Sequence, residues 1–187
     1  MDLQKQATIL IHETKQDLAK EYMALIRDYY EDLYEEEPLK PQNWKAVCEI
    51  RILSGILYES LENYDVAIPL YESVFPILNT YNESDPDNPE YRSIVSVLYT
   101  QLGISYHQAG EFDKSKDAFE KSISINSKLF DEEPDNFMYM GTLAAVFSEY
   151  SKLLTSLGRK EEAEEYTAKI EEIKGKVFEK FGTDEIE

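Results

Sequence analysis

The sequence predicts an all-α protein built from antiparallel helix hairpins, and three observations lead to this prediction. Pro38, Pro86 and Pro134 each follow an acidic residue and are evenly spaced, since 86 − 38 = 134 − 86 = 48. Small and apolar residues recur at one-face helical spacings on both sides of Gly110, at i, i+1 and i+4 before it and at i, i+4 and i+7 after it. Gly110 and, one such step later, Gly158 are placed to end helices, because glycine readily takes a positive φ.

The same step relates many other positions, and internal repeats of this kind indicate a stacked array of supersecondary units. The positions that share register are Gly55 with Gly103, Tyr58 with Tyr106, Asp87 with Asp135, Asn88 with Asn136, Tyr91 with Tyr139, and the small residues Ala19, Ala67, Ser115 and Ala163.

The unit around Gly110 resembles the tetratricopeptide repeat (TPR). Gly103 precedes Tyr106 in the first helical pattern, Gly110 supplies the turn, and Ser115, Phe119 and Ser122 give the small–aromatic–small pattern of the second helix. The resemblance implies a right-handed superhelical solenoid of units at about 1–37, 38–85, 86–133 and 134–182, in one domain over 1–182. A period of 48 instead of about 34 residues adds roughly two helical turns to each helix.

The first half of the chain is expected to hold a truncated helix followed by three full helices. Residues 1–12 carry a short helical stripe and correspond to a truncated first helix, and residues 15–36 form its partner. After a proline-containing linker, the next hairpin is predicted at 43–60 and 64–81. Pro76 lies inside the second of these helices, and we expect a kink or a break near it, because proline removes a hydrogen bond and clashes with the preceding turn.

The second half is expected to hold two regular hairpins. Asn88 is a good cap and Pro89 suits the first helical position, so helices are predicted at 89–109 and 112–131. Asp135 or Asn136 caps the next helix, and the last hairpin is predicted at 137–157 and 160–180. The charged final helix suits the end of an array, and residues 183–187 are predicted to be a disordered tail.

The composition excludes several classes of partner. The chain has 38 acidic against 19 basic residues, a net charge of −19, which repels phosphate backbones and anionic membranes. No apolar run reaches the roughly 20 residues that span a bilayer. The first ten residues lack the layout of a signal peptide, so we expect a cytoplasmic protein that binds neither nucleic acid nor membrane.

No motif in the sequence indicates catalysis, a metal or a cofactor. His12 and His107 lie far apart, and neither belongs to a metal-ligand pair. Cys48 has no histidine in its own helix and is interpreted as a small buried residue. We therefore predict that the protein is not an enzyme and has no cofactor.

The resemblance implies that the first helices of the hairpins line a concave groove that binds a peptide or a helical segment of a protein. By register, the predicted groove residues are Glu49, Ile52, Leu53, Ile56, Glu59, Val97, Thr100, Gln101, Ile104, His107, Gln108, Glu149 and Lys152. The apolar members would hold apolar anchors, and the net negative charge would favour basic flanks on the partner.

Two alternatives to a groove-binding interaction module stay open. An apolar edge near Leu10, Leu18 and Tyr22 would let a scaffold associate with itself, giving a homo-oligomer through the N-terminal edge. A chaperone-like holder of a basic or secreted partner would also suit an acidic solenoid. The sequence does not identify the partner.

Overall fold

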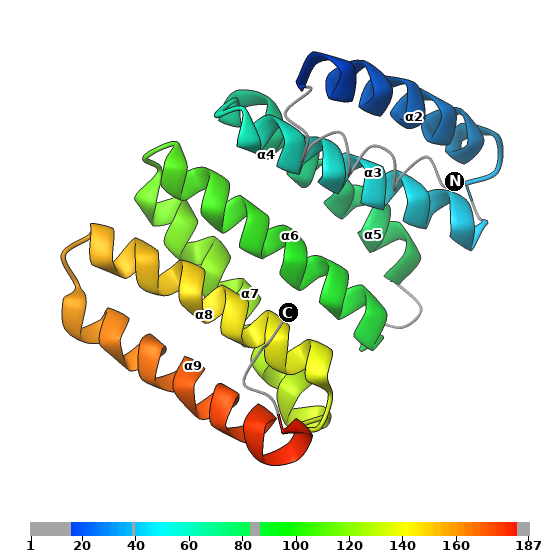
Figure 1. Ribbon diagram of the computed structural model, residues 1–187. Helices are drawn as coiled ribbons and strands as arrows, with labels where there is room; N and C mark the ends of the chain where they lie inside the picture. Colours follow the sequence, from blue (N-terminus) through cyan, green and yellow to red (C-terminus); the bar gives the residue numbers. More distant parts are fainter. Residues whose placement is uncertain (1–15, 39, 83–86, 183–187) are drawn as a thin grey trace. The chain divides into compact units, whose positions relative to one another are not determined.

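The computed structural model describes residues 16–38, 40–82 and 87–182, and all the regular structure in these ranges is helical. The helices are α2 (Gln16–Glu36), α3 (Pro41–Ser60), α4 (Tyr64–Glu72), α5 (Val74–Asn82), α6 (Pro89–Gln108), α7 (Phe112–Glu132), α8 (Phe137–Ser156) and α9 (Lys160–Phe181). Helices pair as hairpins, α2 with α3, α3 with α4, α6 with α7 and α8 with α9, as Figure 1 shows. The predicted all-α class of antiparallel hairpins is confirmed. The predicted helix at 1–12 and the tail at 183–187 lie outside the described residues.

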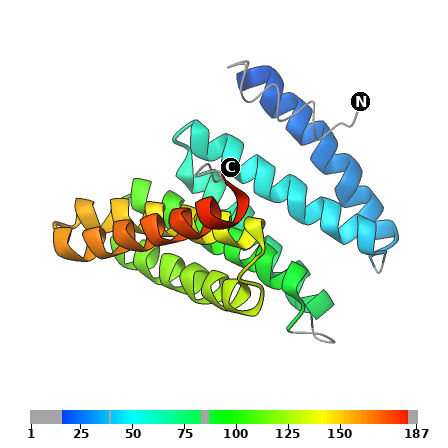
Figure 2. The ribbon, with the colours of Figure 1, turned by 60° about the horizontal axis from the view of Figure 1, so that its bottom comes forward.

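The chain divides into two compact units, Met1–Ser84 and Asp85–Glu187. In unit 1, α3 packs against α2, α4 and α5. In unit 2, α8 packs against α7, α6 and α9, so that the α8/α9 hairpin follows the α6/α7 hairpin (Figures 1 and 2). The boundary between the units falls next to the predicted repeat boundary at Pro86. A single domain over 1–182 stays a prediction.

The predicted caps and turns of unit 2 are confirmed. The Asn88 side chain accepts from the backbone N–H groups of Glu90 and Tyr91 at 3.0 and 3.2 Å, and Asn136 starts α8 in the same way. At the turn between α6 and α7, Gly110 has φ 78°, and the Glu111 N–H donates to the Tyr106 carbonyl at 2.8 Å. This is the left-handed ending that glycine allows without steric cost.

The structure differs from the sequence prediction at the start of α3 and in the second helix of unit 1. The helix begins at Pro41 and not at residue 43, because proline suits the first helical turn, where no N–H is needed. The predicted helix at 64–81 is interrupted at Ser73, which separates α4 from α5. This break places Pro76 in the first turn of α5, where its missing N–H costs nothing.

Arg51 donates a hydrogen bond to the backbone at the break between α4 and α5. Its Nη1 donates to the Ser73 carbonyl at 2.8 Å, a carbonyl group next to the interruption. Its Nε and Nη2 donate to the two carboxylate oxygens of Glu31 in α2, both at 2.8 Å. One side chain therefore ties three elements of unit 1 together, which explains why an arginine stands where Tyr99 and Phe147 occupy the register in unit 2.

Each unit has its own apolar core. In unit 1, Ala19, Met23 and Ile26 of α2 are buried together with Ile50 and Leu57 of α3. In unit 2, the core contains Phe119 of α7, most of the large apolar side chains of α8, and residues of α9. Its buried members are Phe119, Met140, Leu143, Ala144, Val146, Phe147, Tyr150, Leu153, Leu154, Ala163, Ile173 and Val177.

A buried polar network joins α6 to α7, and the sequence pattern did not predict it. Ser122 Oγ donates to the Ser96 carbonyl at 2.9 Å and lies 2.7 Å from the Thr100 hydroxyl. Asn126 Nδ2 donates to Ser122 Oγ at 3.1 Å, and Ser96 Oγ donates to Asn126 Oδ1 at 3.2 Å. These hydroxyl and amide groups satisfy one another away from water, so the hairpin can bury them.

Within the described ranges, no helix combines the length and apolar character needed to cross a membrane.

Candidate interaction site

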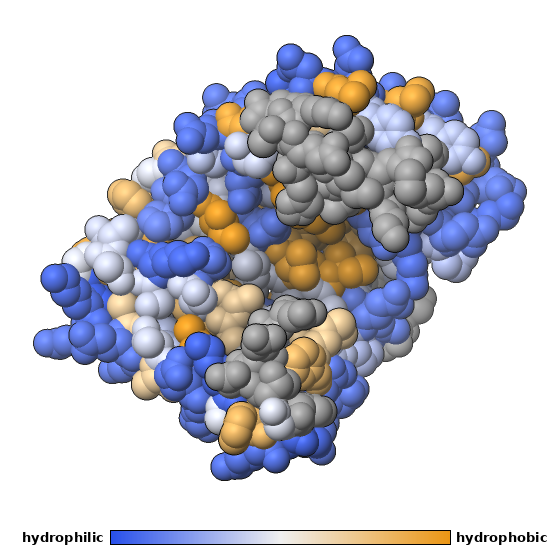
Figure 3. Space-filling view, in the orientation of Figure 1, coloured by the Kyte–Doolittle hydropathy of each residue, from blue (hydrophilic) through white to orange (hydrophobic). Residues whose placement is uncertain are grey.

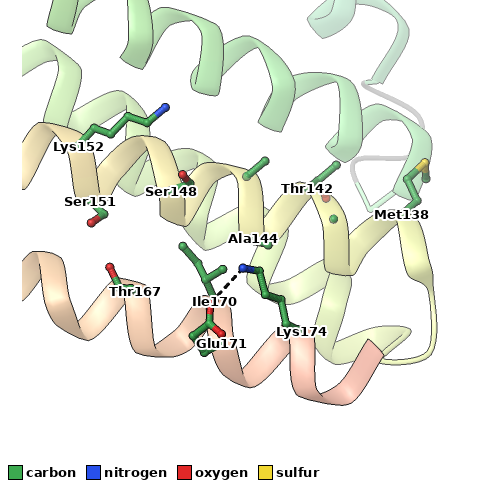
Figure 4. A pocket seen from close by; sticks show the side chains of 12 residues that line it. Met138, Thr142, Ala144, Ser148, Ser151, Lys152, Thr167, Ile170, Glu171 and Lys174 are labelled. Carbon is green, nitrogen blue, oxygen red and sulfur yellow. Dashed lines mark hydrogen bonds and ion pairs between the residues drawn. The ribbon is translucent and has the colours of Figure 1, made fainter. Parts of the chain in front are cut away.

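A groove of about 650 Å³ lies between α8 and α9, within unit 2 (Figure 4). It is lined from α8 by Met138, Gly141, Thr142, Ala144, Ala145, Ser148, Ser151 and Lys152, and from α9 by Thr167, Ile170, Glu171 and Lys174. The groove is therefore formed by both helices of the last hairpin.

The floor of the groove is a row of small residues on α8. Gly141, Ala145, Ser148 and Lys152 follow one another at i, i+4, i+7 and i+11, so they share one face of the helix. The bulky residues of α8 are used on its other faces, in the core. Between Met138 and Lys152 the row has no large side chain, so a second helix could approach α8 closely there.

Ile170 of α9 forms the apolar wall, and charged side chains form the rim. In Figure 4, Ile170 points from α9 toward α8, and Lys152 and Lys174 stand on different helices of the groove. Lys174 pairs with Glu171 at 3.0 Å, and Lys152 pairs with Glu149 at 2.6 Å. Lys152, Lys174 and Glu171 are exposed and Glu149 is half-buried, so the lysine charges remain available to a ligand at little cost.

The hydroxyl groups in the groove are mostly turned inward. Ser151 Oγ and Thr167 Oγ1 both donate to the Ala163 carbonyl, each at 3.1 Å, and Thr142 Oγ1 donates to the Tyr139 carbonyl at 3.2 Å. The floor therefore presents mainly methyl and methylene groups to a ligand. The arrangement suits an apolar helix face better than a small polar molecule.

Each groove residue has a register partner 48 positions earlier, in the α6/α7 hairpin, and the surroundings of these partners can be compared with the groove. Phe119 stands one repeat before Thr167, and Ile123 stands one repeat before Glu171. Phe119 is fully buried in the core that contains the buried face of α8, and Ile123 packs against the same core. Ile104, the register partner of Lys152, packs there as well. The α8/α9 groove is therefore the position at which a further helix would pack.

The polar replacements explain why this groove can stay open in water. Lys152, Thr167 and Glu171 stand where the preceding hairpin has isoleucine, phenylalanine and isoleucine. These changes lower the apolar area that the groove exposes to water. Small apolar residues remain along the floor, so the surface is amphipathic.

The predicted site residues of unit 1 all lie on α3, with different surroundings. Glu49 is exposed, whereas Ile52 and Ile56 are half-buried.

Leu53 packs against the core that α2 and α3 share. The Glu59 carboxylate accepts a hydrogen bond from the Tyr71 hydroxyl at 3.2 Å, so it is already engaged within the unit.

The predicted residues of α6 also divide between packing and surface. Val97 and Gln108 are exposed, and Gln101 is half-buried. Thr100 takes part in the buried hydroxyl network with Ser122. His107 Nε2 lies 2.9 Å from the Ser156 hydroxyl, and burial lowers the pKa of His107, partly offset by Glu149.

On α8, Lys152 lines the groove, and Glu149 is the carboxylate that pairs with it. The α9 residues of the groove were missed, because the resemblance directed attention to the first helix of each hairpin. The repeat itself held the signal, since Thr167 and Glu171 share register with two buried or partly buried residues of the preceding hairpin.

Cys48 is buried, as interpreted from the sequence. Burial raises the pKa of its thiol to about 12, with a smaller opposing effect from Arg51. The thiol is therefore protonated near neutral pH and unsuited to act as a nucleophile.

Comparison with known proteins bears on the family of the chain. Residues 97–129, which run from α6 through the Gly110 turn into α7, match the tetratricopeptide repeat family. The chain is also similar to a solved structure described as MamA AMB-1, with 17% sequence identity and a TM-score of 0.43, over 91% of this chain and 96% of that chain. No curated protein matches the sequence. The matched repeat and the regular recurrence of the hairpins support assignment to the tetratricopeptide repeat superfamily.

Proposed function

We propose that the protein is a non-enzymatic protein–protein interaction module that holds a helical segment in the α8/α9 groove. One observation carries this proposal: α8 packs against α7 and α6, and Ile104, Phe119 and Ile123, the register partners of Lys152, Thr167 and Glu171, contact the core that contains α8. A surface that accepts a helix at one step of a repeat array is suited to accept a helix at the next step. TPR proteins generally bind protein partners, which agrees with this role.

The packing within the chain indicates the chemistry of the partner. Ile50 and Leu57 of α3, and Leu61 directly after it, pack against the core shared with α2, at i, i+7 and i+11. Two of the same register positions, Val146 and Leu153, are buried in α8, whereas the third, Leu157, follows the helix and is exposed. A partner for the groove is therefore an amphipathic helix with large apolar residues at this spacing, as in other helix-in-groove complexes.

The net charge supports a second part of the proposal. The first helices of the hairpins would attract a basic segment of the partner. The whole chain carries −19, and Glu49 is exposed on α3. Glu59 and Glu149 are half-buried, so Glu49 is the most accessible acidic contact of the three. Electrostatic steering would raise the rate at which a basic segment arrives.

A matched pair of alanine substitutions tests the groove. Ala145 is exposed on the groove floor, and Ala168 is exposed on α9 outside the groove lining. Ala145→Glu fills the floor with a charged side chain, whereas Ala168→Glu makes the same chemical change elsewhere. Tagged wild type and both variants are used to capture partners from the native lysate, and the captured proteins are quantified by mass spectrometry.

We expect wild type and Ala168→Glu to capture the same proteins, and Ala145→Glu to lose at least one of them about tenfold or more, as for an unpaired charge placed in an apolar contact. Thermal melts of all three proteins check that folding is retained. If Ala145→Glu captures the same proteins in the same amounts as Ala168→Glu, the groove is not the binding site.

A further inference from the structure

An exposed apolar stripe runs along α2, in the unit that does not contain the groove. Leu18, Leu25 and Tyr29 have exposed fractions of 51%, 67% and 54%. They stand at i, i+7 and i+11, so they share one helix face. In Figure 3, apolar side chains interrupt the hydrophilic surface over α2. A stripe of large exposed apolar residues usually marks a surface that binds something.

This stripe is separate from the face of α2 that builds the core of unit 1. Ala19, Met23 and Ile26 point into that core and are buried. Leu18 and Leu25 therefore are not needed to hold α2 on α3. The helix has an apolar face for its own unit and a second apolar face next to it.

The spacing of the stripe matches the spacing that the groove requires. Leu18, Leu25 and Tyr29 repeat the i, i+7, i+11 pattern of Ile50, Leu57 and Leu61, which pack α3 on its neighbour. The stripe therefore has the spacing of large apolar residues that we propose for the partner of the groove.

Charge also matches between the stripe and the groove. Glu21, Asp28 and Asp32 are exposed on α2 and lie together on one border of the stripe, by their i, i+7 and i+11 spacing. The rim of the groove carries Lys152 and Lys174, with exposed fractions of 62% and 44%. Their present partners are Glu149, which is half-buried, and Glu171, which is exposed, and ion pairs at the surface exchange at little cost.

We propose that the α8/α9 groove binds α2 of a second copy of this chain. This inference rests on the proposed function, namely that the groove holds a helix. The contact is head-to-tail, because the stripe of one copy meets the groove of the next. Each added copy leaves one stripe and one groove free, so assembly continues into an open chain or closes into a ring.

Two blocked variants of the full chain test this contact. Leu25→Glu blocks the stripe at a position that is two-thirds exposed, and Ala145→Glu blocks the groove. Sedimentation equilibrium is measured for wild type, each variant, Ala168→Glu as control, and an equimolar mixture of Leu25→Glu with Ala145→Glu, at roughly 1 to 100 μM.

We expect the average mass of wild type and Ala168→Glu to rise with concentration, and each blocked variant alone to stay monomeric. The mixture should form dimers and nothing larger, since it contains one free groove and one free stripe per pair. Circular dichroism shows whether each variant keeps the wild-type helix content and melting temperature.

The inference is wrong if wild type is monomeric over the whole range, if the single variants associate as wild type does, or if the mixture stays monomeric. Its failure can be told apart from failure of the proposed function. If wild type is monomeric and Ala145→Glu still loses captured proteins, the groove holds a helix from another protein. If Ala145→Glu neither dissociates the copies nor loses captured proteins, both proposals fail.

Discussion

At the scale of single residues, Glu62 adopts a backbone conformation that its register partners leave to glycine. Glu62 has φ 57°, while Gly110 and Gly158, one and two repeats later, have φ 78° and 77°. A side chain in this region crowds its own backbone, at a cost of roughly 1–2 kcal/mol. The turn between α3 and α4 is therefore strained where the turns at Gly110 and Gly158 are not.

Replacing Glu62 by glycine is expected to stabilise unit 1. The gain in the folded state is partly offset by the greater freedom of glycine in the unfolded chain, which leaves about 0.5–1 kcal/mol. Urea unfolding followed by the fluorescence of Trp44, the chain's one tryptophan, measures the change in unit 1. A lower midpoint for Glu62→Gly would show that the glutamate side chain stabilises this turn.

Gly103 is expected to tolerate no side chain. A Cβ atom built there lies 2.7 Å from Cδ1 of Phe119, whose ring is fully buried, and the Ser115 hydroxyl donates to the Gly103 carbonyl at 2.7 Å. Gly103→Leu should destabilise unit 2 by about 1–3 kcal/mol through overpacking.

Gly175 is the matched control, because a Cβ atom there has no neighbour within 4 Å. Gly175→Ala should stabilise α9 by up to about 1 kcal/mol, since alanine is the better helix former. Thermal melts followed by far-UV circular dichroism compare the two. Equal melting temperatures for Gly103→Leu and wild type would mean that α6 and α7 do not approach each other at Gly103.

At the scale of elements, unit 1 depends on one side chain that the regular repeat does not contain. Arg51 binds Glu31 with two hydrogen bonds and the Ser73 carbonyl with a third, and both charged side chains are about three-quarters buried. The interruption between α4 and α5 therefore comes with its own hydrogen-bond donor. A break without such a donor would leave a carbonyl group poorly satisfied.

Arg51→Met keeps much of the side-chain length and removes these hydrogen bonds, so we expect a loss of about 2 kcal/mol from unit 1. Lys20→Met serves as the control. It removes an exposed pair with Asp17 at 3.3 Å, and should change stability by no more than about 0.5 kcal/mol. Trp44 fluorescence in urea measures both. Similar effects of the two substitutions would contradict the role given to Arg51.

At the scale of the whole molecule, the net charge of −19 acts on every encounter. Two copies repel each other at long range, whereas a basic partner is attracted. Salt screens both effects, with a Debye length of about 30 Å at 0.01 M and about 8 Å at 0.15 M. The apolar stripe and groove are short-range contacts and are affected much less.

Raising the salt from about 0.01 M to 0.15 M is therefore expected to strengthen self-association and to slow the association of a basic partner. Sedimentation equilibrium measures the first, and stopped-flow mixing with a captured partner measures the second. Self-association that weakens with salt would indicate that charge pairs at the rim, and not the apolar stripe, hold the copies together.

Much of the fold could be predicted from the sequence, because its signals are local. Asn88 and Asn136 cap the helices that follow them, and Gly110 and Gly158 end helices by their own backbone preference. The alignment of Gly103 with Gly55 also follows from the repeat. Each of these depends on residues within one or two turns, or on a regular spacing, so the sequence alone was sufficient to find them.

Which faces are covered was decided by the tertiary structure. Leu53 and Ile104 are groove residues by register, yet they pack against cores to which neighbouring helices contribute. Ile170 lines a candidate site because, among the described residues, no further helix covers the groove between α8 and α9. Burial depends on contacts between residues far apart in the chain, and a helical pattern reveals an apolar face without revealing which neighbour covers it.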